Sequence, residues 1–285
     1  MNKNFLTGLF AATAITGMVA TAPAHANTTT PPIKSVNEAP SYFKNNLQNM
    51  RDFVGKEARQ LDLKTIQAQK VDLSNFILKY EHDVNVFFLG ETAGGYRNRL
   101  DYKSTFGNTT NTGKLFGDTS CATGQTIANF SAFCANPNNA VAGRSKTDSP
   151  LQVGDWVSIG SQKAGTQLDF LLHSNDINGG IKGKSVLTGQ DNTKGIWSLN
   201  DKLNHDGLQH AMGYYYNDLL VIGFEDLWGG GDKDYNDTVF VIDVGKDNAR
   251  HLAGIKAVPE PTTGAALLGV GVVGLLKSRR RRVTK

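Results

Sequence analysis

Residues 219 to 244 read LLVIGFEDLWGGGDKDYNDTVFVIDV, two apolar runs on either side of an acidic, glycine-rich segment. The runs Leu219–Phe224 and Thr238–Val244 are short and rich in β-branched and aromatic residues, a composition typical of strands. Gly229, Gly230 and Gly231 between them allow a sharp turn of the backbone. The stretch therefore predicts two strands joined by an acidic loop, and it favours a mainly β fold.

The acidic loop carries five carboxylates and one amide oxygen within 13 residues, with Lys233 as the only basic side chain among them. Neighbouring carboxylates near a protein surface repel each other by about 1 to 4 kcal/mol per pair, which a divalent cation relieves. Calcium prefers six to eight oxygen ligands. We therefore expect calcium, the alternative being a solvated acidic turn without metal. The predicted ligands are Glu225, Asp226, Asp232, Asp234, Asn236 and Asp237.

The run Asp232-Lys233-Asp234-Tyr235-Asn236 also matches the start of an EF-hand loop. The match fails at the sixth position, which is Asp237 instead of glycine. The twelfth position would be Asp243, which an extended strand would carry about 20 Å from the loop. The sequence thus predicts a calcium loop between strands instead of a helix–loop–helix unit.

Further short runs with strand composition are separated by clusters of Gly, Asn and Asp. The intervening stretch Thr92–Pro150 is rich in Gly, Asn, Thr and Ser, and it predicts irregular strands and surface loops. We expect a jelly-roll-like β-sandwich in which strands from both ends of the domain pair, with a strand order that the sequence leaves open. The runs are Asn75–Tyr80, Val84–Leu89, Trp156–Ile159 and Gln167–Leu172, and Tyr214–Tyr216 is a further strand candidate.

A helical pattern precedes the strands. Apolar residues from Ser41 to Leu61 recur in steps of three and four, and polar residues fill the positions between them. This spacing predicts an amphipathic helix that packs on the main domain. The Thr- and Pro-rich segment Thr28–Pro32 before it predicts a linker.

The chain ends in VPEPTTGAALLGVGVVGLLKSRRRRVTK, residues 258 to 285. Its uncharged run Thr262–Leu276 has 15 residues, whereas a membrane span needs about 20. The glycine-rich run and the basic block after it suit one short hydrophobic helix with its arginines at the cytoplasmic face. The alternative is a buried C-terminal helix followed by a solvated tail.

This order of elements resembles the PEP-CTERM sorting signal of Gram-negative bacteria. The resemblance implies processing by an exosortase after export by the secretion machinery. It also implies transient anchoring in the inner membrane and delivery to the cell surface or the extracellular matrix. The matching residues are Val258, Pro259, Glu260 and Pro261, the hydrophobic run, and Arg279, Arg280, Arg281 and Arg282.

The other end of the chain predicts a secretory signal peptide over residues 1–26. Lys3 precedes an apolar stretch, and Ala24-His25-Ala26 has the small-x-small pattern of a cleavage site. An uncleaved anchor is the less favoured alternative. The predicted organisation is therefore a signal peptide (1–26), a linker with the helix (27–70), a β-sandwich domain (71–257) and a sorting and anchor segment (258–285).

Charge and cysteine content fit an exported protein. Without the signal peptide and the tail, 23 basic and 25 acidic residues remain, a net charge of −2 that gives no basic surface for nucleic acid. The two cysteines, Cys121 and Cys134, enclose 12 residues. In an oxidising compartment we expect a local disulfide between them, the alternative being two thiols.

The segments His82–Leu100 (HDVNVFFLGETAGGYRNRL) and Leu219–Val244 together resemble an uncharacterised bacterial extracellular domain family that occurs in PEP-CTERM and adhesin-like proteins. The resemblance would cover Val71–Val244. It suggests calcium binding by Asp226, Asp232, Asp234, Asn236 and Asp237. The pair Gly94-Gly95 adds a glycine to the family pattern, which leaves the geometry of that loop open.

These features predict an exported protein with a calcium-stabilised β-sandwich and a structural or adhesive role. The alternative is a calcium-dependent carbohydrate-binding module in which Trp228 or Tyr235 stacks on a sugar of an extracellular polysaccharide, although either ring could instead stiffen the loop. A hydrolase using Glu225 and Asp226 is less favoured, because adjacent residues of a strand point to opposite faces. The sequence has none of the common nucleophile or zinc-protease motifs either, and we expect no enzymatic activity.

Overall fold

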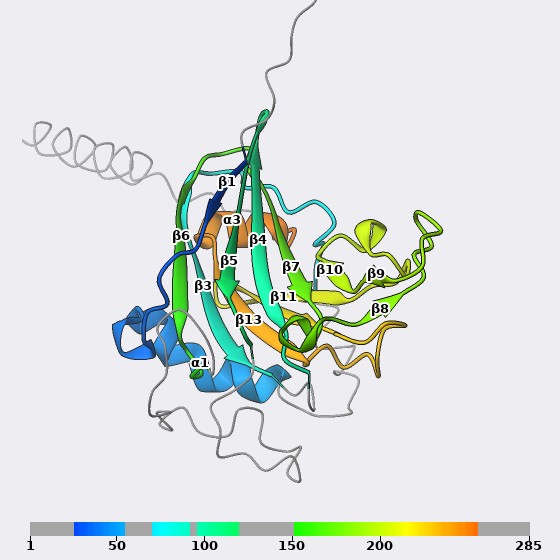
Figure 1. Ribbon diagram of the computed structural model, residues 1–285. Helices are drawn as coiled ribbons and strands as arrows, with labels where there is room; N and C mark the ends of the chain where they lie inside the picture. The colour runs from blue at the N-terminus through cyan, green and yellow to red at the C-terminus, as the bar shows by residue number, and fades with distance from the viewer. Residues whose placement is uncertain (1–25, 55–69, 92–95, 120–150, 256–285) are drawn as a thin grey trace, which may run out of the picture.

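The computed structural model describes residues 26–54, 70–91, 96–119 and 151–255 of the 285-residue chain. These ranges are mainly β, and their strands form two large sheets in which all neighbours but one edge pair run antiparallel. Figure 1 shows the sheets one in front of the other, with the small hairpin of β8 (Lys182–Gly183) and β9 (Thr193–Lys194) at one side. This arrangement supports the predicted β-sandwich.

One sheet has five strands in the order β1-β5-β4-β7-β10. At its centre, β4 and β5 form a hairpin that turns at Gly107, whose positive φ of 56° suits glycine. The sequence predicted only irregular strands and loops here, because Thr, Asn and Gly occupy many positions and the regular alternation of apolar and polar residues is hard to recognise. The strands are β1 (Ala26–Thr29), β4 (Arg99–Phe106), β5 (Thr109–Phe116), β7 (Gln167–His173) and β10 (Ile196–Ser198).

The other sheet has six strands in the order β2-β11-β12-β13-β3-β6. Its central strands β12 and β13 are the two predicted around the acidic loop, and β13 pairs with β3. Strands from the two ends of the domain therefore pair, as predicted. The strands are β2 (Lys70–Val71), β3 (His82–Gly90), β6 (Trp156–Gln162), β11 (Ala211–Tyr216), β12 (Leu219–Phe224) and β13 (Thr238–Asp243).

The main core lies between the two sheets. Alternate residues of β4 and β7 point inward, and they meet apolar side chains of β3, β12 and β13. Aromatic pairs join the sheets, with ring centroids 5.5 Å apart for Phe170 and Phe240 and 6.0 Å apart for Phe88 and Phe116. These pairs fix the spacing of the sheets where the acidic loop begins.

The outer face of the six-stranded sheet packs against helix α1 (Ser41–Val54). Phe43 of α1 stacks on Phe87 of β3 with ring centroids 4.0 Å apart, and Met50 is fully buried in the same cluster. Since both faces of this sheet are covered, every residue of β12 and β13 is buried. The predicted helix began at Ser41, as α1 does, and positions 55–61 of that prediction lie outside the described residues.

Two local predictions differ from the structure. In the linker expected at Thr28–Pro32, the first two residues belong to β1, which adds a parallel edge strand to β5 and so satisfies backbone groups of that edge. The strand expected at Asn75–Tyr80 is irregular, with one bridge from Ile77 to Gln167. Beyond the bridge, the Asn248 side chain accepts hydrogen bonds from the backbone N–H groups of Lys79 and Tyr80, so no strand partner is needed there.

The remaining described elements are short. They are the 3₁₀ helices η1 (Val36–Glu38), η2 (Asp176–Asn178) and η3 (Asp201–Leu203) and the helix α3 (Lys246–Leu252). Within the described ranges, no helix is long and apolar enough to cross a membrane. Residues 1–25 of the predicted signal peptide, the cysteine pair Cys121–Cys134 and the sorting and anchor segment lie outside the described residues.

Candidate metal centre

The acidic loop begins where β12 ends, and its first two carboxylates have different hydrogen-bond partners. The Glu225 carboxylate accepts a hydrogen bond from the backbone N–H of Tyr235, 2.8 Å away, within the loop. The Asp226 carboxylate instead accepts from the side-chain amide of Asn98, 2.8 Å away, just before β4 of the opposite sheet. Glu225 is therefore held within the loop, whereas Asp226 is tied to the opposite sheet.

Three of the predicted ligands converge. Glu225, Asp232 and Asp234 each offer a carboxylate oxygen, and these oxygens all lie within 4.8 Å of one another. Glu225 and Asp234 are buried, with 1% and 3% of their surface exposed, whereas Asp232 is exposed. Two buried carboxylates and one exposed carboxylate thus bring their oxygen atoms together, and oxygen is the ligand atom that calcium prefers.

The other three predicted ligands are arranged differently. Asp237 accepts a hydrogen bond from the backbone N–H of Asp226, 2.8 Å away, at the base of the loop. Asn236 donates from its side-chain nitrogen to Asp234 at 2.8 Å. Three carboxylates of the loop thus form a group that could hold a metal, while Asp226 and Asp237 contact each other at the loop base and Asp237 is still close enough to raise the pKa of Glu225.

Glu91, another acid near the loop, follows Gly90, the last residue of β3, which pairs with Val239. It therefore lies at the strand end beside the loop base. It does not belong to the group of three carboxylates that the described residues form.

The backbone of the loop is held in an unusual shape. Gly229, Gly230 and Gly231 have positive φ, and so do Lys233 at 68° and Tyr235 at 55°. Such conformations cost about 1 to 3 kcal/mol at a residue other than glycine unless the surroundings impose them. A cation bound by the three carboxylates would help to impose this shape.

Gly231 is the glycine that the site requires most. A Cβ atom at this position would overlap Oε2 of Glu225, whereas a Cβ atom at Gly229 would have no atom within 4 Å. The Glu225 carboxylate can therefore lie against the loop only because residue 231 has no side chain.

We expect Gly231→Ala to destabilise the calcium-free protein by at least about 3 kcal/mol, since a clash adds to the strain of a positive φ. Gly107→Ala is the matched control, because its φ of 56° is close to the 48° of Gly231 and a Cβ atom there would meet no atom within 4 Å, so it should cost about 1 kcal/mol. Urea denaturation of both variants in a chelator measures the difference. Equal costs would show that Glu225 does not lie against Gly231.

The loop base rests on a buried aromatic pair that the sequence did not single out. Trp197 donates from its ring nitrogen to the backbone carbonyl of Asp226 at 3.0 Å, and its ring stacks on His210 at a centroid distance of 3.7 Å. His210 in turn contacts the Glu225 carbonyl at 2.9 Å and Asp206 at 2.8 Å. In the sequence, the histidines show no metal-ligand spacing, and nothing near His210 marks it as a residue that packs beneath the loop.

Burial and repulsion between carboxylates raise the pKa values of two acids of the loop, Glu225 and Asp226. Burial raises the pKa of Glu225 to about 8, and the carboxylates of Asp237, Asp234 and Asp232 contribute to the increase. Burial also raises the pKa of Asp226, and the neighbouring Asp237 raises it further. Without a cation, Glu225 and Asp226 therefore favour their protonated forms at neutral pH.

The two aromatic residues of the loop, Trp228 and Tyr235, pack against neighbouring residues of the domain. The Trp228 ring lies against the backbone of Gly183 in β8, and it meets Trp197 edge to face at 5.4 Å. Tyr235 is only 8% exposed, and its carbonyl lies directly over Gly223 of β12. Both rings therefore stiffen the loop.

Comparison with known proteins identifies two regions. Residues 163–245 match a family described as a domain of unknown function (DUF4114), and residues 257–282 match the PEP-CTERM protein-sorting motif. The first match contains the whole acidic loop and both flanking strands, whereas the earlier segment His82–Leu100 lies outside it. No curated protein and no solved structure matches the chain. The sorting motif implies an exported protein that an exosortase processes.

Proposed function

We propose that calcium binds at the acidic loop and stabilises the β-sandwich of this exported protein, which then has a structural or adhesive role. The cell surface or the extracellular matrix is the proposed destination, reached after transient anchoring in the inner membrane. The sorting motif supports export. The metal is supported by the convergence of Glu225, Asp232 and Asp234 within 4.8 Å, the observation on which the proposal depends.

The position of the loop favours a stabilising role for the ion. The loop joins β12 and β13, the two fully buried strands at the centre of the six-stranded sheet. An ion that holds the loop closed therefore holds together the strand ends that border the main core. Calcium fits better than magnesium, since an irregular group of carboxylates suits its flexible coordination, whereas magnesium demands near-ideal octahedral geometry.

Calcium is expected to raise the melting temperature of the purified protein. An ion present at about 1,000 times its dissociation constant stabilises by about 4 kcal/mol, which corresponds to about 10 °C for a domain of this size. Differential scanning calorimetry in calcium and in chelator measures the shift, with magnesium as the control cation. Identical melting curves in calcium and in chelator would contradict the proposal.

A carbohydrate-binding role has less support. Its expected sugar platforms, Trp228 and Tyr235, are packed against the loop and its neighbours. An extracellular polysaccharide is therefore proposed as a partner only because a protein of the cell surface or the matrix is surrounded by such polymers.

The proposal also assigns no catalysis to the acidic loop. Glu225 and Asp226 face different partners, Tyr235 within the loop and Asn98 across the sandwich. Two carboxylates that act as acid and base on one bond must face the same substrate, and the different partners of these two argue against such a pair.

A further inference from the structure

Asn98 ties the acidic loop to the opposite sheet. Its side chain is fully buried and bridges two segments that are distant in the sequence. The amide nitrogen donates to Oδ2 of Asp226 at 2.8 Å, and the amide oxygen accepts from the backbone N–H of Asn175 at 2.7 Å. One side chain thus joins the base of the loop to the turn that follows β7.

The chemistry of its partners fixes the orientation of this amide. A backbone N–H can only donate, so the amide oxygen must face Asn175, and the amide nitrogen is then the group that faces Asp226. The Asn98 backbone carbonyl also accepts from Thr119 at 2.7 Å. Residue 98 is therefore held by its backbone as well as by its side chain.

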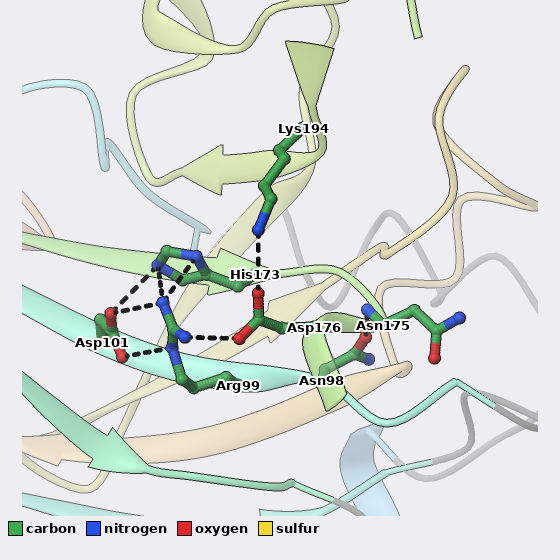
Figure 2. A network of polar contacts seen from close by, with 7 residues as sticks. All are labelled: Asn98, Arg99, Asp101, His173, Asn175, Asp176 and Lys194. Carbon is green, nitrogen blue, oxygen red and sulfur yellow. Dashed lines mark hydrogen bonds and ion pairs between the residues drawn. The ribbon is translucent and has the colours of Figure 1, made fainter. Parts of the chain in front are cut away.

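The arginines on either side anchor Asn98 in place. Arg97 forms an ion pair with the buried carboxylate of Asp118. On the other side, the Arg99 guanidinium contacts Asp101, Asp176 and His173, a network in which Asp176 also meets Lys194 (Figure 2). Figure 2 also shows Asn98 and Asn175 beside this network, close to the η2 turn.

We infer that Asn98 is a positioning residue of the metal centre: by holding Asp226 at the loop base, it places the adjacent Glu225 for calcium. This inference rests on the proposed function. Glu225 and Asp226 are consecutive, so the direction of one side chain constrains the other. Residues that orient a metal ligand without touching the metal typically change metal affinity by about 10- to 100-fold when removed.

The test is a double-mutant cycle with calcium affinity as the readout. Asn98→Ala is expected to weaken calcium binding by about 10- to 100-fold, measured by titration calorimetry with calcium chloride. In an Asp226→Ala background the same substitution should change the affinity by less than about threefold, because its target is gone. Should Asn98→Ala fold poorly, Asn98→Ser replaces it, since a hydroxyl cannot span the gap between Asn175 and Asp226.

Asn248→Ala is the matched control. Asn248 is also a buried amide that bridges two segments, donating to the backbone carbonyls of Tyr80 and Val244, but it belongs to α3. Its loss should lower the melting temperature and leave calcium affinity unchanged within about twofold. A purely structural role of Asn98 would make the two variants behave alike.

The outcomes separate the inference from the proposed function. If the wild-type protein binds calcium and Asn98→Ala binds it as tightly as Asn248→Ala does, Asn98 only stabilises the fold and the inference is wrong. An equal loss in both Asp226 backgrounds also overturns it. If the wild-type protein binds no calcium, the proposed function fails and the inference fails with it.

Discussion

Replacing Glu225 by glutamine is expected to weaken calcium binding by at least about 100-fold and to stabilise the calcium-free protein at pH 8. Glutamine keeps the shape of the protonated acid and removes the negative charge that Asp237, Asp234 and Asp232 repel. The same substitution therefore removes a proposed calcium ligand and relieves the charge repulsion of the calcium-free state. Titration calorimetry measures the first effect, and urea denaturation in chelator measures the second.

Asp243→Asn is the matched control, because Asp243 is also a largely buried acid of the same hairpin. It lies at the far end of β13, where it contacts Tyr42 and the backbone N–H of Gly245. Its replacement should lower stability and leave calcium affinity unchanged. A Glu225→Gln protein that binds calcium like the wild type would exclude Glu225 as a ligand.

The calcium-free protein is expected to lose stability as the pH rises from about 4.5 to about 8. The pKa of Glu225 is raised from 4.5 to about 8 in the folded state, so the folded protein binds this proton more tightly than the unfolded chain does. The proton's contribution is complete below pH 4.5 and is lost as the pH approaches 8. At about 1.4 kcal/mol for each unit of pKa difference, the loss is on the order of 4 kcal/mol.

Saturating calcium should reverse this trend, because the ion replaces the proton and binds the ionised acids more tightly as the pH rises. Unfolding free energies in urea, measured at several pH values with calcium and with chelator, test both slopes. The Glu225→Gln variant should have a flatter profile in chelator. A wild-type protein whose stability in chelator increases from pH 5 to pH 8 would contradict the assignment of Glu225 as a buried, repelled acid.

Several features could be predicted because neighbouring residues encode them. The strands β12 and β13 follow from apolar runs, and the acidic loop follows from the composition between them. The sorting motif is likewise a contiguous pattern, and comparison with known proteins supports it.

Other features escaped prediction because their signals are weak or distant. The hairpin of β4 and β5 forms from residues of modest strand propensity, and its apolar positions pack on the opposite sheet. The edge strand β1 forms because β5 offers it unpaired backbone groups. In both cases the tertiary environment outweighs local preference.

The amino-acid sequence by itself determined that two strands would flank a loop rich in carboxylates and that the protein would be exported. Both the strand–loop–strand pattern and the sorting motif consist of consecutive residues. Only the tertiary structure decided which of those oxygens converge. Glu225, Asp232 and Asp234 meet within the loop, while Asp226 is held by Asn98, 128 residues away in the chain. The physical reason is that a buried carboxylate must find its hydrogen-bond donors wherever the packing of the two sheets places them.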